Sequence, residues 1–200
     1  AYALDANTTA VSNTAVGADS LTSNTTGNSN TGVGHQSLKL NITGSYNAAF
    51  GLNALLFQTS GTSNTAVGAS ALQANTTASD NTAVGRSALG GNTTGTANAA
   101  VGRNAMLTNT TGGYNTAFGA YSLKLNTTAN HNTAVGGNAL NQNTTGANNT
   151  GIGKDALYAN TTGGDNVAVG SEALDANTTG EQNTALGYRS LSTNTTGKWN

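Results

Sequence analysis

The sequence predicts an all-β fold, a parallel β-solenoid or β-roll built from coils of 17 residues. The first observation is a strict repeat: the motif Asn-Thr-Ala-Val-Gly, with a few replacements, begins at Asn13 and returns every 17 residues to Asn183, and Asn200 falls on the next start. The second is the short period, because helical repeats and propeller blades need about 33 to 50 residues per unit. The third is the abundance of Gly, Asn and Thr where a helix would favour Ala, Leu and Glu. One coil stacked on the last by backbone pairing fits all three observations.

The composition excludes several classes of protein. Leu, Ile, Val and Phe together supply 31 of the 200 residues, which is too few for an ordinary globular core. A chain with so few apolar residues is typically disordered when it also has a high net charge. Here seven Lys and Arg are offset by eight Asp and Glu, and the net charge is −1. This balance gives no electrostatic basis for binding nucleic acid. The lack of Cys excludes disulfides and thiolate metal sites, and no apolar run approaches the ~20 residues of a membrane helix.

The repeat has the consensus N-T-A-V-G-x-x-(A/S)-L-x-x-N-T-T-G-x-x, and its positions are numbered from zero at the first Asn. The phase never shifts, so we expect residues 1–200 to form a single uninterrupted array of about 12 coils with no capping domain. We also expect the array to be a segment of a longer fibre, or a filament that grows by end-to-end stacking of open solenoid ends.

Two repeat positions carry large apolar residues and predict the core. Position three is Val, Phe, Ile or Leu in every complete repeat, and position eight is Leu except for one Met. Since alternate residues of a strand point the same way, the mostly Thr position one is expected to be partly buried beside position three. The predicted core ladder of the first four repeats consists of Val16, Leu21, Val33, Leu38, Phe50, Leu55, Val67 and Leu72.

Position two faces the other way by the same alternation, and it is Ala or Gly in every complete repeat. A solvated strand face normally varies and carries polar side chains. An unbroken row of small residues therefore indicates close approach by another copy of the chain, unless Ala is present only because it suits a tight turn region. The predicted chain–chain interface begins with Ala15, Gly32, Ala49, Ala66 and Ala83.

Glycine and asparagine occupy fixed positions in the turns. Position four is Gly in every complete repeat, which predicts a positive φ there. Position zero is always Asn, and position eleven is Asn with Gln58 as the lone replacement. Stacked Asn side chains can pass amide hydrogen bonds from coil to coil, and buried amides satisfied in this way would replace part of the missing apolar core.

These motifs resemble those of a known family. N-T-A-V-G-x-x-A-L is similar to the N-S-V-A-I-G-x-x-A repeats in the heads of trimeric autotransporter adhesins of the YadA type. The whole consensus is still more similar to the N-T-A-hydrophobic-G…A-L…N-T-T-G arrays of bacterial surface proteins and phage tail-fibre proteins that precede an intramolecular chaperone domain. The resemblance implies a left-handed β-roll and a homotrimer, with Thr14-Ala15-Val16 as the inner-wall strand and Ala15 toward the trimer interface. The period of 17 residues is longer than that of the adhesin heads.

One cluster of charged residues has the spacing of a catalytic pair. Asp155 and Glu172 occupy position six of consecutive coils, about 5 Å apart, which is typical of the two carboxylates of a retaining glycosidase. Arg189 follows at the same position and Lys154 lies beside the first carboxylate. Because these cations can neutralise both acids, a surface charge cluster is the favoured interpretation.

No other residues combine as a reactive site. His35 and His131 lie several coils apart and cannot meet without another chain. No activated Ser and no cluster with ligand spacing is visible. We therefore predict that the chain is no enzyme and has no catalytic residue, no cofactor and no metal site.

The Asn-Thr-Thr triplets create a possible N-glycosylation acceptor in nearly every coil. The simpler interpretation is that Asn-Thr-Thr-Gly is favourable turn chemistry, and glycans on coils ~5 Å apart would crowd one another. The candidate sites are Asn7, Asn24, Asn41, Asn75, Asn92, Asn109, Asn126, Asn143, Asn160, Asn177 and Asn194.

The expected function is that of an extracellular structural fibre or stalk, on a cell or virion surface, which provides length, rigidity and adhesive display. Its expected partners are other copies of itself, as a homotrimer or filament, and a host or environmental glycan, with no nucleic acid and no membrane span. The alternative is a surface-binding module that recognises a glycan or ice through the variable faces, because regular Thr rows can order water and aromatic side chains can stack on sugar rings.

Overall fold

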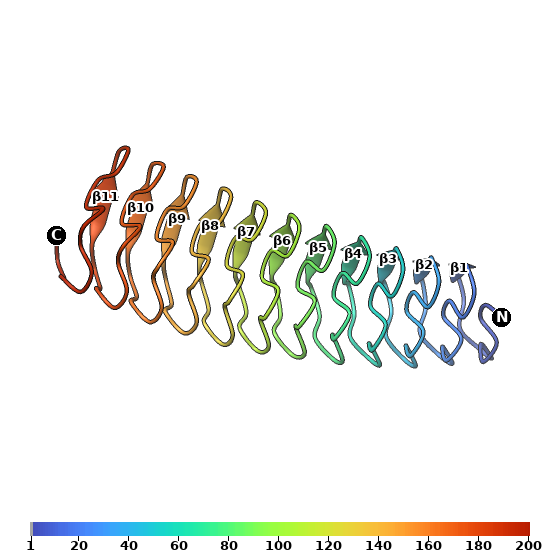
Figure 1. Ribbon diagram of the computed structural model, residues 1–200. Coiled ribbons are helices and arrows are strands. Elements are labelled where there is room, and N and C mark those ends of the chain that lie inside the picture. The colour runs from blue at the N-terminus through green and yellow to red at the C-terminus, as the bar shows by residue number, and fades with distance from the viewer. Residues whose placement is uncertain (1) are drawn as a thin grey trace.

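The computed structural model describes residues 2–200 as an elongated rod of stacked coils, with the two ends of the chain at opposite ends of the rod (Figure 1). Each coil contributes one strand of three residues, at repeat positions one to three. The strands are β1 (Thr14–Val16), β2 (Thr31–Val33), β3 (Ala48–Phe50), β4 (Thr65–Val67), β5 (Thr82–Val84), β6 (Ala99–Val101), β7 (Thr116–Phe118), β8 (Thr133–Val135), β9 (Thr150–Ile152), β10 (Val167–Val169) and β11 (Thr184–Leu186). The predicted parallel β-solenoid of 17-residue coils is confirmed.

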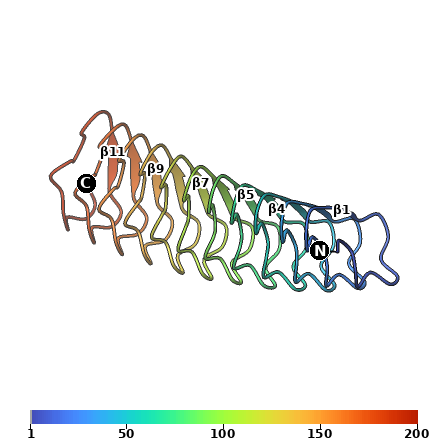
Figure 2. The same cartoon turned by 45° about the vertical axis from the view of Figure 1, so that its right-hand side comes forward.

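The strands form a single parallel sheet in chain order, from β1 to β11, along one wall of the rod (Figure 2). Equivalent residues pair directly, as Thr14 with Thr31 and Val16 with Val33, so every repeat position forms a straight column. The remaining residues of each coil form turns that stack on their counterparts in the same register. Residues 2–200 contain no helix long and apolar enough to cross a membrane.

The interior of the coil is thin and holds one large apolar side chain per repeat. The predicted leucines of position eight, Leu21, Leu38, Leu55 and Leu72, are fully buried. The rest of the apolar core is alanine, at positions two and seven. This explains how a chain so poor in large apolar residues folds, because most of the core is built from methyl groups and amides.

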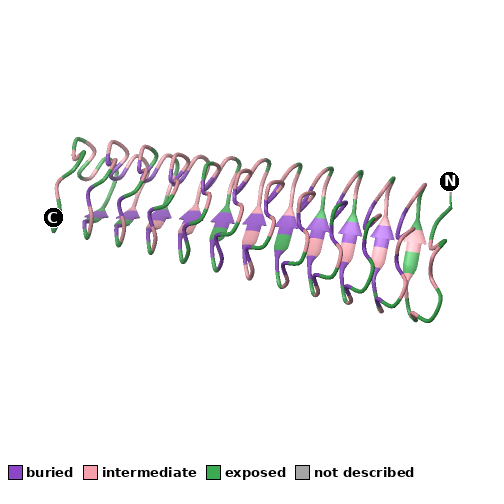
Figure 3. Ribbon diagram, turned by 90° about the horizontal axis from the view of Figure 1, so that it is seen from below, coloured by how far each residue is buried: buried purple, intermediate pink, exposed green. Residues whose placement is uncertain are grey.

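Position three lies outside this core, so its predicted burial is wrong. Val16, Phe50 and Val67 are 56%, 41% and 38% exposed, and Val33 is half-buried. These side chains point away from the interior, on the same face of the sheet as position one. Figure 3 shows how the strands from β2 to β11 each combine a buried residue with half-buried or exposed ones, whereas β1, in the first coil, has none that is buried.

Position two points inward instead, and the predicted chain–chain interface is therefore also wrong. Gly32, Ala49, Ala66 and Ala83 are buried inside their own chain, and Ala15 is half-buried against the core. Residues buried within one coil cannot contact a second chain.

The thin interior explains the small residues at position two. A Cβ atom on Gly32 would lie 2.6 Å from Ser20 Oγ and 3.1 Å from Ser37 Oγ, on the opposite wall of the coil. A larger side chain in such a space would force the walls apart. The alternation of the strand was predicted correctly, but the row is small because two walls of one coil approach each other, rather than because another chain does.

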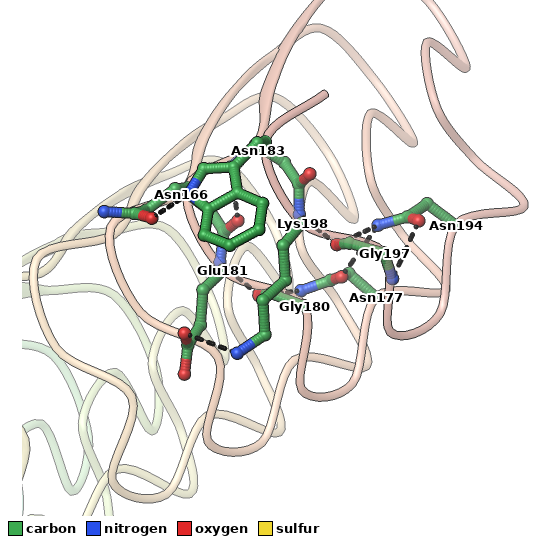
Figure 4. A network of polar contacts seen from close by, with 10 residues as sticks. Asn166, Asn177, Gly180, Glu181, Asn183, Asn194, Gly197 and Lys198 are labelled. Carbon is green, nitrogen blue, oxygen red and sulfur yellow. Dashed lines mark hydrogen bonds and ion pairs between the residues drawn. The ribbon is translucent and has the colours of Figure 1, made fainter.

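Two columns of asparagine run along the interior, as the sequence predicts. At position zero, the backbone N–H of each Asn donates to Oδ1 of the Asn one coil earlier, at 2.8–3.1 Å from Asn30 to Asn200. At position eleven, Nδ2 donates to Oδ1 one coil earlier, as from Asn177 to Asn160 at 2.9 Å. The carbonyl of position fourteen joins the columns, since Gly180 O accepts from Asn166 Nδ2 at 2.8 Å and from Asn177 Nδ2 at 3.0 Å (Figure 4).

The turns use left-handed backbone at three positions that are not glycine. Positions six, eight and sixteen have positive φ, for example 57° at Asn53, 52° at Leu55 and 58° at Ser63. Asn, Asp and Ser, which are common at positions six and sixteen, hydrogen-bond locally and tolerate this region. Leu at position eight meets a cost of roughly 1–2 kcal/mol there, which its complete burial offsets.

Candidate functional surfaces

The outer face of the sheet carries one continuous apolar row. This surface, made of positions one and three of β1 to β11, is named the sheet face. Position three is half-buried or exposed in every strand, reaching 56% at Phe118 and 78% at Leu186. Position one is Thr in eight of the eleven strands, and neither row contains a charged residue. The sheet face is therefore flat, uncharged and periodic.

The sequon asparagines lie in the interior columns, which excludes them as glycan acceptors in this fold. Asn24, Asn41, Asn75, Asn92, Asn109, Asn126, Asn143, Asn160 and Asn177 are fully buried. Their Nδ2 atoms, to which a glycan would be attached, donate hydrogen bonds inside the coil, as Asn109 Nδ2 does to Asn92 Oδ1 at 2.8 Å and to Gly112 O at 2.9 Å. Asn7 and Asn194 are half-buried in the same column and donate from Nδ2 as well.

The carboxylates at position six form ion pairs, as expected of a surface charge cluster. Asp155 Oδ2 lies 2.9 Å from Lys154 Nζ, and Glu172 Oε2 lies 2.5 Å from Arg189 Nε. Burial raises the pKa of Asp155, but hydrogen bonds from Lys154 and Asn138 outweigh it and hold that pKa below the usual value. The hydrogen bond to Glu172 raises the pKa of Arg189. Asp155 is thus stabilised as a carboxylate and lacks the raised pKa of a general acid, and Glu172 is held in an ion pair with Arg189.

A shallow, open groove lies beside these ion pairs. Its lining residues are Asn138, Asp155, Tyr158, Glu172 and Asp175. The groove is acidic and open to solvent, and nothing in its geometry activates a nucleophile.

One histidine and two of the exposed aromatic residues contact side chains of neighbouring coils. His131 stacks on Tyr114 with ring centroids 5.3 Å apart, and His35 lies several coils away, as predicted. Trp199 donates from its indole to Gln182 in the coil below. In the part of the chain that the structure describes, no three His, Asp or Glu side chains are grouped in a way that could hold a metal ion.

One group of residues was not identified from the sequence. Arg103 and Lys124 both approach the ring of Tyr121, and Arg86 precedes Arg103 at the same repeat position. The sequence did contain a signal: three consecutive repeats each carry a cation at position five or nine, and none of these repeats has an acid at either position.

Comparisons with protein-family models, with curated proteins and with solved structures find no match to this chain.

Proposed function

We propose that this chain is a rigid structural segment of an extracellular fibre, in which copies associate side by side through the sheet face. The observation that carries the proposal is the unbroken apolar row at position three, which a single chain leaves exposed or half-buried. Large contiguous apolar patches are rare on monomeric proteins and mark interaction sites.

The dimensions of the sheet face suit such an association. Eleven strands spaced ~4.8 Å apart give a face roughly 50 Å long, and three residues of strand give a width of roughly 10 Å. Two copies would bury on the order of 1,000 Å² in total, which is the lower range of a specific interface. Because both rows lack charge, this burial carries no penalty for desolvating ions.

The specific assembly that we propose is a homotrimer of left-handed coils, by analogy with the adhesin heads whose motif the chain resembles. The rod would supply length and stiffness on a cell or virion surface. Its variable corners would remain outside the assembly, free for display and adhesion.

Native mass spectrometry and sedimentation equilibrium test the assembly. The chain is expected to have three times its sequence mass. The double variant Val67→Lys with Ile152→Lys places charges on the sheet face, so it is expected to be monomeric with an unchanged far-ultraviolet circular dichroism spectrum. Leu40→Lys is the matched control, since Leu40 is similarly exposed but lies at position ten. A parent chain that is monomeric at every concentration, or a double variant that still associates, contradicts the proposal.

Ice binding is a second candidate function for the same surface. The Thr hydroxyls of position one and the methyl groups of position three repeat once per coil on a flat face, and such an array can order water. Thermal hysteresis near the freezing point measures this activity. We expect any hysteresis to disappear in Thr65→Lys with Thr82→Lys, both of which lie on the sheet face, and its absence from the parent chain rules this function out.

A further inference from the structure

The cations of this chain divide into two groups. Four of the seven Lys and Arg residues form ion pairs with carboxylates. These paired cations are Lys39, Lys154, Arg189 and Lys198. The other three, Arg86, Arg103 and Lys124, have no such pair within residues 2–200, and all three lie on one stretch of the rod. In a chain with a net charge of −1, this concentration of unbalanced positive charge is a distinct feature.

Tyr121 brings two of these cations together. The Arg103 guanidinium carbon lies 4.7 Å from the centre of the Tyr121 ring, and Lys124 Nζ lies 5.6 Å from it. Both distances are within the range of a cation–π interaction. The backbone supports the same arrangement, since Tyr121 N donates to Arg103 O at 3.0 Å.

Arg86 extends the group by one coil. It occupies position five directly before Arg103, and its carbonyl accepts from Asn104 N at 3.0 Å in that next coil. Arg86 and Arg103 are exposed, while Lys124 is half-buried. The three charges therefore span two coil spacings, or roughly 10 Å. Arg86, Arg103, Tyr121 and Lys124 are named the cationic cluster.

The carboxylates of this chain leave the cationic cluster unbalanced. Along the same corner the next acids are Asp155, which is paired with Lys154, and Glu172, which is paired with Arg189. They begin two coils beyond Tyr121, about 10 Å away, where solvent ions screen most of the interaction. The acids without an ion pair are spread over different coils and corners, as Asp5, Asp80, Asp165 and Asp175. In the acidic groove, Asp155 and Glu172 are already neutralised by Lys154 and Arg189, so a second copy of the chain offers only Asp175 there as an unbalanced carboxylate.

We infer that the cationic cluster binds an anionic saccharide, a sugar chain that bears carboxylate or sulfate groups. Two guanidinium groups one coil apart can each bind an oxyanion through two parallel hydrogen bonds, and Lys124 adds a third point of charge. A nucleic acid fits less well, because the Tyr121 ring is already occupied by cations rather than free for base stacking, and because the chain as a whole is slightly acidic. The site lies outside the sheet face, so it does not depend on self-association.

Calorimetric titration with short, defined oligosaccharides tests this inference. The probes are a heparin oligosaccharide for sulfate, an oligogalacturonate for carboxylate, and a neutral malto-oligosaccharide of equal length. We expect one or both acidic probes to bind, the neutral probe not to bind, and affinity to fall with added salt. Arg103→Gln is expected to weaken binding about tenfold or more, as for loss of a charged hydrogen bond, with partial recovery in Arg103→Lys.

The matched control is Lys154→Gln, which makes the same change in net charge at the same repeat position. It is expected to leave affinity within about twofold of the parent chain, since its charge is already neutralised by Asp155. Equal losses in Arg103→Gln and Lys154→Gln overturn the inference, because they would indicate general charge attraction. So does the absence of binding to both acidic probes, or equal binding of a single-stranded oligonucleotide. We expect Arg103→Gln to have the same assembly mass as the parent chain. A loss of saccharide binding in this variant is then independent of association through the sheet face.

Discussion

The two asparagine columns share one interior but differ at one coil. The column at position zero is unbroken, and every backbone N–H from Asn30 onward has its amide acceptor. The column at position eleven is interrupted where Gln58 replaces Asn. There Nε2 reaches Gly61 O at 3.0 Å, as an asparagine would, and Oε1 accepts from Asn75 Nδ2 and also from Asn64 Nδ2, both at 3.0 Å. Asn41 Oδ1 is left buried with no hydrogen-bond partner.

The difference shows that the column depends on the length of the side chain as well as on its amide group. The extra methylene of Gln58 carries the amide toward the neighbouring column, where it bonds Asn64 of position zero. The link back to the previous coil is lost, and one coil-to-coil contact at position eleven is missing.

The largest effect is expected from creating a deeper break in the regular part of the column. Asn109→Leu keeps the volume but removes the donor to Asn92 Oδ1 and Gly112 O and the acceptor for Asn126 Nδ2. Asn92 Oδ1 is left without a partner, while Gly112 O keeps its bond from Asn98 Nδ2 and Asn126 Nδ2 keeps its bond to Ala129 O. The loss of three buried hydrogen bonds is expected to cost about 3 kcal/mol, measured as a loss in the free energy of unfolding in urea.

Asn130→Leu is the control for that substitution. Asn130 is exposed and its Oδ1 accepts one hydrogen bond, from Gly113 N at 2.7 Å. A cost of about 1 kcal/mol is expected. A cost equal to that of Asn109→Leu would show that a buried amide of the column stabilises the rod no more than an exposed amide does.

The next effect concerns the two faces of a strand. Ala83→Val in β5 overfills the interior and is expected to cost about 1–3 kcal/mol, whereas Val84→Ala, on the sheet face, is expected to cost less than about 1 kcal/mol. Both are measured in the background of Val67→Lys with Ile152→Lys, so that association does not contribute. If Val84→Ala cost more than Ala83→Val, position three would belong to the core, contrary to the structure.

Repair of the interrupted column is expected to have a smaller effect of opposite sign. Gln58→Asn should restore the donor to Asn41 Oδ1 and stabilise the rod by about 1 kcal/mol, read as a higher thermal midpoint. Gln73→Asn, the same chemical change at a half-buried position outside the columns, should leave the midpoint unchanged. A lower midpoint for Gln58→Asn would mean that the bond to Asn64 matters more than the missing link.

The smallest effect is expected from acid, because the columns contain no titratable group. A hydrogen bond from Lys39 lowers the pKa of Asp19, and the pKa of Asp155 is also below the usual value. Stability from such groups is present above the unfolded pKa of about 3.9 and is lost as the pH falls through the lower folded value. We expect circular dichroism to show only a slightly lower thermal midpoint at about pH 3 than at pH 5, and cooperative acid unfolding there would contradict this account.

Periodicity predicted most of the fold. The 17-residue coil, the parallel in-register pairing, the buried Leu row and both asparagine columns follow from strict spacing, because a fixed period forces each residue type into one column. The period alone did not predict which face of each strand points into the coil. With three residues per strand, alternation says that positions one and three oppose position two, but it does not say which side is inside.

The decisive fact was the thickness of the interior, which comes from the turns. Left-handed residues such as Asn53 and Leu55 bring the opposite wall close to the strand, and only Ala or Gly then fits inside. The cationic cluster was missed for a related reason. Arg103 and Tyr121 belong to different coils and different repeat positions, and only the stacking of coils brings their side chains together.

The in-register stacking also sets how this chain reaches its folded state. Nearly every hydrogen bond between coils joins residues 16 to 18 apart in the sequence, so the mean contact separation relative to a chain of 200 residues is on the order of 0.1. That value belongs to fast-folding helical bundles rather than to β-sandwiches, although the protein is all-β. Each new coil needs only the edge of the coil before it as a template, so folding can propagate in both directions from any nucleus. The rate of each step is then set by the closure of one 17-residue loop.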